Sequence, residues 1–173
     1  MAEKAAPLPE PWLRGTLTEV PSVQRGVLHA LELAGEDLQR SCASLSDEQL
    51  NARPAQIASV AFHLRHISRS LDRLLTYAEG RPLSEEQLAA LRSEGNPGAT
   101  RDELFDELSA ALAESATRVR ALSHADLEAA RAVGRSKLPT TLGGLLVHIA
   151  DHTQRHVGQA ITTAKIVLAS QAK

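Results

Sequence analysis

Apolar residues recur every three or four positions along most of the chain, which is the spacing of one face of an α-helix. Four long segments keep this pattern, at residues 22–45, 54–78, 100–122 and 142–169. The stripe of the second segment consists of Val60, Leu64, Ile67, Leu71 and Leu74. The hydrophobic pattern therefore predicts four long helices, each with one apolar face to bury.

Helix start and stop signals separate these segments. Three pairs of residues have the spacing of a capping box, in which a Ser or Thr side chain and a Glu or Gln side chain satisfy backbone amides at a helix start. The pairs are Ser46 with Gln49, Ser84 with Gln87, and Thr100 with Glu103. Gly80 and Pro82 are expected to end the second long helix, and Pro139 with Thr140 and Thr141 to precede the last one.

The connections between the long segments are short. SEEQLAALRS predicts a short helix, a second short helical piece is expected near SHADLEAAR, and AVGRSKLP predicts an irregular connection. No segment alternates between apolar and polar residues for more than a few positions, so no strand is expected. The predicted fold is all-α, a four-helix bundle with short connecting helices.

Length and composition support one helical domain. The chain has 173 residues and only 2% aromatic residues, and it is rich in Leu and Ala, which favour helices over sheets. Pro7, Pro9 and Pro11 indicate an extended lead-in over residues 1–20. Residues 21–173 are then expected to form a single domain.

Several classes of function are not expected. The formal net charge is −2 and no basic stripe is present, so nucleic acid is not an expected partner. No run of about 18 apolar residues or signal peptide is found, so we expect a cytoplasmic protein that does not enter a membrane. Cys42 is the single cysteine, which excludes an internal disulfide and a multi-thiolate zinc site; we expect it to be a small, buried side chain.

The histidines carry the candidate chemistry. His148, His152 and His156 follow one another at a spacing of four, so they lie on one side of the last predicted helix. They could form a metal-binding ladder or a polar helix edge. The run HTQRH has no glutamate after its first histidine, which excludes the zinc-protease pattern H-E-x-x-H.

A second pair of histidines lies on the second predicted helix. His63 and His66 are three residues apart in SVAFHLRHISRSLDRLL, and either could face the last helix. Helical periodicity slightly favours His63 as the inward residue, but it does not decide between the two. His29 and His124 have no such neighbours, and we expect them at a core edge or on the surface.

Together, SVAFHLRHISRSLDRLL and HIADHTQRHVGQ resemble the DinB-like/YfiT-like superfamily of four-helix-bundle metalloproteins. The resemblance implies that His66, His152 and His156 are metal ligands, because they match the family's single histidine and its H-x-x-x-H pair. Gly158 and Gln159 match the dipeptide that follows the pair. The chain departs from the family at residue 157, where Val replaces a common basic residue. It also has two additional histidines, His63 and His148. Each of these could support a metal ligand, replace one or do neither.

The resemblance implies a divalent metal ion, zinc or nickel first, with iron and copper as alternatives, because imidazole suits all of them. Three neutral imidazoles leave the ion its full charge, which favours deprotonation of a coordinated water or thiol. The family suggests a metal-dependent hydrolase or a thiol S-transferase, a small-molecule substrate such as a low-molecular-weight thiol, and a homodimer. A non-catalytic metal-binding protein and a metal-free bundle are the alternatives. No catalytic base stands out, and no residue is assigned to an organic cofactor.

Overall fold

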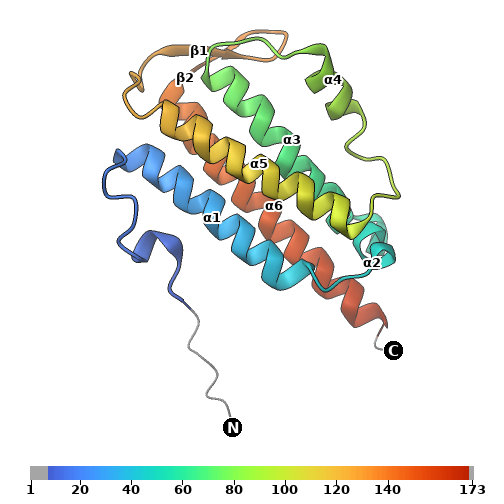
Figure 1. Ribbon diagram of the computed structural model, residues 1–173. Coiled ribbons are helices and arrows are strands. Elements are labelled where there is room, and N and C mark those ends of the chain that lie inside the picture. Colours follow the sequence, from blue (N-terminus) through green and yellow to red (C-terminus); the bar gives the residue numbers. More distant parts are fainter. Residues whose placement is uncertain (1–7, 172–173) are drawn as a thin grey trace.

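The computed structural model describes residues 8–171, and four long helices dominate it (Figure 1). They are α1 (Ser22–Cys42), α3 (Val60–Ala78), α5 (Arg101–Ala121) and α6 (Leu142–Gln171). Around the bundle, α1 and α3 each pack against both α5 and α6. α1 and α6 run in one direction and α3 and α5 in the other (Figure 1). The predicted all-α four-helix bundle is confirmed.

Short elements join the long helices. α2 (Asp47–Asn51) links α1 to α3, and α4 (Glu85–Arg92) lies in the crossover that returns the chain from the end of α3 to the start of α5 (Figure 1). Two 3₁₀-helices, η1 (Pro11–Leu13) and η2 (Pro54–Gln56), precede α1 and α3. None of the helices in the described residues combines the length and the apolar character that a membrane span needs.

All three predicted capping boxes form. Ser46, Ser84 and Thr100 each accept a hydrogen bond from the backbone N–H three residues later, and the partner side chain at that position accepts one from the backbone of the cap. These caps satisfy amides that a helix start leaves without an intrahelical partner. They fix the start of α2, α4 and α5 at the predicted residues.

α3 begins later than the pattern predicted. The helix was expected from residue 54, but it starts at Val60, with the Ser59 hydroxyl accepting a hydrogen bond from the Phe62 N–H. Ahead of it, Ala55 and Gln56 have φ values of 48° and 62°, which an α-helix cannot contain. The apolar stripe alone could not locate this break, because no stripe residue lies between 54 and 59.

Residues 8–20, the described part of the predicted lead-in, are not simply extended. η1 interrupts it, and Arg14 donates hydrogen bonds to the carboxylates of Glu32 and Glu36 on α1. Val20, at its end, is buried in the hydrophobic core. Residues 1–7, with Pro7 among them, lie outside the described residues.

The segment between α5 and α6 contradicts the prediction. The short helix expected near SHADLEAAR is absent; turns lead instead into an antiparallel hairpin of β1 (Ala130–Val133) and β2 (Leu138–Thr141). The Asp126 side chain accepts a hydrogen bond from the Glu128 N–H, an Asx-turn that competes with helix formation. Arg131 then holds the hairpin to α3 by donating from Nε to the Ala78 carbonyl oxygen.

The core lies between the four helices and consists mostly of leucine. Its largest fully buried apolar side chains are Leu38, Leu45, Leu50, Leu64, Ile67, Leu71, Leu75, Leu104, Leu142, Leu146 and Ile149. Cys42 is also fully buried, and burial raises the pKa of its thiol to about 11. The thiol is therefore protonated at neutral pH and serves as a small core side chain, as the sequence predicted.

Candidate metal centre

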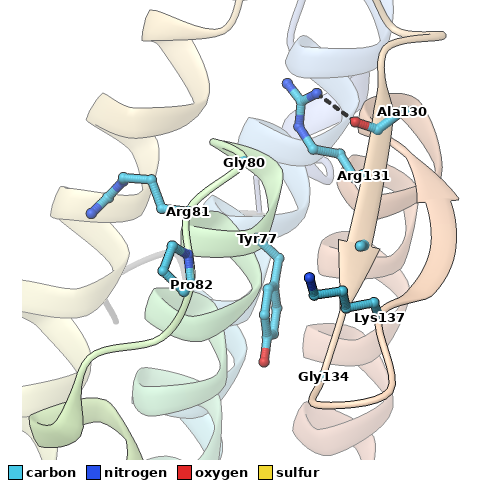
Figure 2. A pocket seen from close by; sticks show the side chains of 9 residues that line it. Tyr77, Gly80, Arg81, Pro82, Ala130, Arg131, Gly134 and Lys137 are labelled. Atoms are coloured by element: carbon cyan, nitrogen blue, oxygen red, sulfur yellow. Dashed lines mark hydrogen bonds between the residues drawn. The ribbon is translucent and has the colours of Figure 1, made fainter.

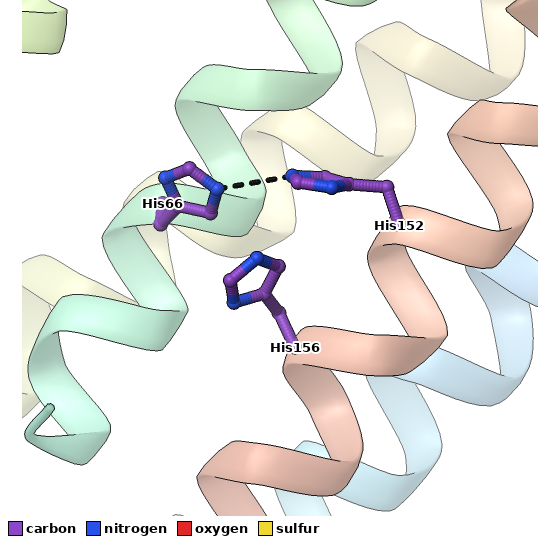
Figure 3. Close-up of side chains that lie close together, drawn as sticks. All are labelled: His66, His152 and His156. Atoms are coloured by element: carbon purple, nitrogen blue, oxygen red, sulfur yellow. Dashed lines mark hydrogen bonds between the residues drawn. The ribbon is translucent and has the colours of Figure 1, made fainter. Parts of the chain in front are cut away.

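Three histidines from two helices converge in the middle of the bundle. His66 comes from α3, and His152 and His156 come from α6, the helix packed antiparallel against α3. One ring nitrogen of each lies within 4.8 Å of the other two, and the rings turn toward one another (Figure 3). The structure thus brings together the three imidazoles that the family resemblance selected, and all three are half-buried.

The spacing of the nitrogens fits a single ion. Two nitrogens at about 2.0–2.1 Å from one metal lie about 2.8–3.4 Å apart, for angles between octahedral and tetrahedral. The Nε2 atoms of His66 and His152 are 3.0 Å apart. Nitrogen atoms of three neutral imidazoles are also a donor set that zinc, nickel, copper and iron accept. The distance between His66 and His152 and the donor chemistry of all three rings therefore fit a divalent transition metal.

Glu94 orients His66 from the side away from the cluster. Its Oε2 lies 2.7 Å from Nδ1 of His66, and its Oε1 accepts a hydrogen bond from the Arg73 guanidinium. Glu94 and Arg73 are both buried. Burial opposes ionisation of Glu94, but hydrogen bonds from His66 and Arg73 outweigh it and hold the carboxyl pKa below its ordinary value. A carboxylate that holds Nδ1–H directs Nε2 toward a metal and makes it a better donor.

His63 contacts His156 as Glu94 contacts His66, from the side away from the cluster. The Nδ1 atoms of the two rings are 3.1 Å apart, so the His156 nitrogen turned toward the cluster is Nε2 (Figure 3). His63 is buried, as periodicity suggested, yet it contacts a cluster histidine instead of joining the cluster. The Phe62 ring stacks on His66 at a centroid distance of 5.4 Å and meets His63 edge-on at 5.3 Å. Both histidines of α3 are thereby fixed in place.

Burial keeps His63, His152 and His156 neutral at neutral pH. It lowers the pKa of His63, His152 and His156 to about 4, with the neighbouring His66 as the next cause. An imidazole that is unprotonated at neutral pH has its ring lone pair free to bind a metal ion. The fold therefore presents these rings in the protonation state that coordination needs.

The metal-free protein should lose stability as the pH falls from about 6.5 to about 4. Unfolded histidines titrate near 6.5, whereas His63, His152 and His156 titrate at about 4 in the folded chain, so the unfolded state takes up protons first. We expect the melting temperature, measured with a chelator present, to fall by at least about 4 °C over this window. His152→Ala should make the slope shallower. A melting temperature that stays level, or a slope unchanged in the variant, would contradict the assignment.

The remaining histidines lie outside the cluster. His148 is exposed, with Nδ1 3.9 Å from the Asp151 carboxylate; its ring centroid is 5.3 Å from that of His152, but it is not one of the three converging histidines. His29 is buried at the edge of the core, 3.1 Å from the Thr16 hydroxyl. His124 is exposed in a turn.

The residues that follow His156 differ in their exposure to solvent. Val157, which replaces the common basic residue, is 2% exposed and belongs to the core, so a charge at this position would be buried. Gln159 is exposed and lines a pocket beside the cluster together with Gly158. Arg155, which precedes His156, lines the same pocket and pairs with Asp151.

This neighbouring pocket has a volume of about 520 Å³ and is open to solvent. His63 forms part of its wall and contacts His156, so a single ring separates the pocket from the cluster. A volume of this size accommodates a small organic molecule. The cluster therefore lies next to a space in which a substrate could bind.

Sequence reasoning missed Glu94 and Arg73, and it had left open whether His63 supports a ligand, replaces one or does neither. Glu94 lies in the loop after α4, where no helical periodicity applies, and no signal in the sequence marks it as buried.

Comparison with known proteins identifies a family. A family model described as the DinB superfamily matches residues 30–160, which include all three cluster histidines and Glu94. No curated protein matches the chain significantly.

Proposed function

The chain belongs to the DinB superfamily, and from this membership and the geometry of its histidine cluster we propose that it is a metal-dependent thiol S-transferase. His66, His152 and His156 would hold one divalent ion, and the enzyme would join a low-molecular-weight thiol to a small electrophile. The observation that carries the proposal is the convergence of three imidazoles from two helices beside an open pocket.

The ion would supply a positive charge that lowers the pKa of a thiol or water in contact with it. A free thiol has a pKa of about 8.5, well below the pKa of water, so the thiol needs less assistance to ionise at neutral pH. The protein's own contribution is to keep His152 and His156 neutral through burial, and to orient His66 and His156 through Glu94 and His63.

The lack of a free base favours thiol transfer over hydrolysis. Among the described residues, Glu94 is the only carboxylate that contacts a cluster histidine, and Arg73 and His66 already occupy both of its oxygens. Asp151 and Asp72 are exposed and paired with Arg155 and Arg118, respectively. A residue that takes a proton from water assists hydrolysis, and no carboxylate in contact with the cluster is free to do so among the described residues.

The pocket beside His63 supports a small, polar substrate. Arg155 offers a cation at its rim, although it is paired with Asp151, and Gln159 and Thr162 add hydrogen-bonding groups. These side chains suit a thiol compound that carries carboxylate or amide groups, as peptide-like and amino-acid thiols do.

Thiol transfer can be measured directly. Zinc- or nickel-loaded protein is incubated with cysteine or glutathione and with 1-chloro-2,4-dinitrobenzene as the electrophile, and loss of free thiol is followed against the uncatalysed rate. We expect the loaded protein to accelerate the reaction and His152→Ala to return it to background. The same protein is offered p-nitrophenyl esters without thiol. Ester hydrolysis without thiol consumption would contradict the transferase assignment, and no turnover of either kind would leave a metal-binding protein without this activity.

A further inference from the structure

A second cavity lies at one end of the bundle, between the C-terminal end of α3 and the β1–β2 hairpin (Figure 2). Its volume is about 570 Å³, within the range of small-molecule sites. Tyr77 and Gly80 line it from the α3 side, and Arg131, Gly134 and Lys137 line it from the hairpin. None of the residues discussed for the histidine cluster borders it.

The cavity is well separated from the histidine cluster. Tyr77 follows His66 by eleven residues of continuous helix, which at 1.5 Å per residue is about 16 Å. On the other side, α6 begins at Leu142 directly after the hairpin, ten residues and about 15 Å before His152. Both helices give the same separation, so a small molecule in this cavity would not reach the cluster.

Positive charge dominates the lining. Three of its side chains, Arg81, Arg131 and Lys137, are cationic, and no acidic residue lines it, although the whole chain has a net charge of −2. Arg81 is neutralised by Glu79 and points away from the hairpin (Figure 2). Two cations remain to act on a ligand, Arg131 and Lys137.

Neither of these two cations is neutralised within residues 8–170. Arg131 donates to carbonyl oxygens, from Nε to Ala78 at the C-terminal end of α3 and from Nη1 to Ala130, and no carboxylate among these residues pairs with it. Lys137 takes part in none of the ion pairs found among these residues. A concave site with two uncompensated cations attracts an anion.

The backbone of the hairpin turn and the ring of Tyr77 also determine the shape of the cavity. Lys137 has a φ of 47°, a left-handed conformation that favours glycine, and its N–H donates to the Gly134 carbonyl to close the hairpin turn. The strained position is occupied by a lysine whose side chain lines the cavity. Across from the hairpin, the Tyr77 ring forms a planar wall from α3 (Figure 2).

We propose that this cavity is a binding site for a small organic anion with a planar ring. The anionic group, a phosphate or carboxylate, lies against Lys137 and Arg131, and the ring packs on Tyr77. The site is independent of metal binding and of the proposed transferase activity.

Phenyl phosphate is the probe that combines both features. It is titrated at pH 7.5 into chelator-treated full-length protein, and backbone amide shifts are followed by NMR. We expect saturable shifts at Gly80, Ala132 and Gly134. Lys137→Gly should weaken binding at least tenfold without loss of folding, because glycine accepts the positive φ without strain.

Two further variants separate specific binding from general attraction. Arg135→Gly removes the same charge from the same turn, but Arg135 does not line the cavity, so we expect less than a twofold change. Tyr77→Leu should weaken phenyl phosphate and leave inorganic phosphate unchanged. The proposal is overturned if shifts do not saturate below about 10 mM phenyl phosphate, if they centre on the histidines, or if Arg135→Gly weakens binding as much as Lys137→Gly.

Discussion

His152→Ala is expected to abolish metal binding and leave the bundle folded. The substitution removes one of three nitrogens that converge from α3 and α6, and two imidazoles then remain to hold the ion. Loss of a partner behind a ligand costs roughly 10–100-fold in metal affinity, and loss of a ligand itself should cost more. Alanine favours the helix, and residue 152 is only half-buried, so the fold should persist.

Metal content and circular dichroism check this expectation together. Protein purified without a polyhistidine tag is loaded with zinc, dialysed and analysed for metal per chain. We expect about one ion for the natural protein and less than about 0.2 for the variant, with equal helicity. His148→Ala is the matched control, since His148 lies one turn away on the same helix and is exposed. Equal metal loss in both variants, or full retention in His152→Ala, would refute the assigned ligands.

Glu94 should affect both metal affinity and stability. Glu94→Ala leaves Arg73 buried without its carboxylate, and breaking a buried pair in this way costs about 3–5 kcal/mol in the free energy of unfolding. Glu94→Gln retains an oxygen that can accept from His66 Nδ1–H but removes the charge. We therefore expect a smaller loss of stability and about a 10–100-fold weaker metal affinity.

Chemical denaturation and competitive metal titration separate these effects. Glu107→Gln is the control, because Glu107 is a half-exposed carboxylate that pairs with Arg69 at the helix surface. It should change stability by less than about 1 kcal/mol and leave metal affinity unaltered. If Glu94→Gln binds metal as tightly as the natural protein, the carboxylate does not position His66.

The fold and the three converging histidines were predicted from different features of the sequence. The long helices followed from periodicity, because each buries a stripe against its neighbours, and the caps followed from local side-chain chemistry. The pair His152 and His156 is visible from its spacing. The choice of His66 over His63 depended on the family motif, because residues three apart differ by only about 60° around a helix.

The remaining features depend on contacts between distant segments. Glu94 is buried because the loop after α4 folds back on α3, where Arg73 and His66 receive its two oxygens. The hairpin was missed because its strands have four residues each, and a glycine and a lysine at positive φ close the turn between them. Periodicity cannot detect strands this short.

The central claim is that imidazoles from α3 and α6 hold one metal ion. Anomalous diffraction from zinc-loaded crystals at the zinc absorption edge tests it most directly. The account predicts one peak at about 2.0–2.1 Å from Nε2 of His66, His152 and His156. A peak bound by histidines of one helix alone, or no peak between these helices with zinc in excess, would contradict it.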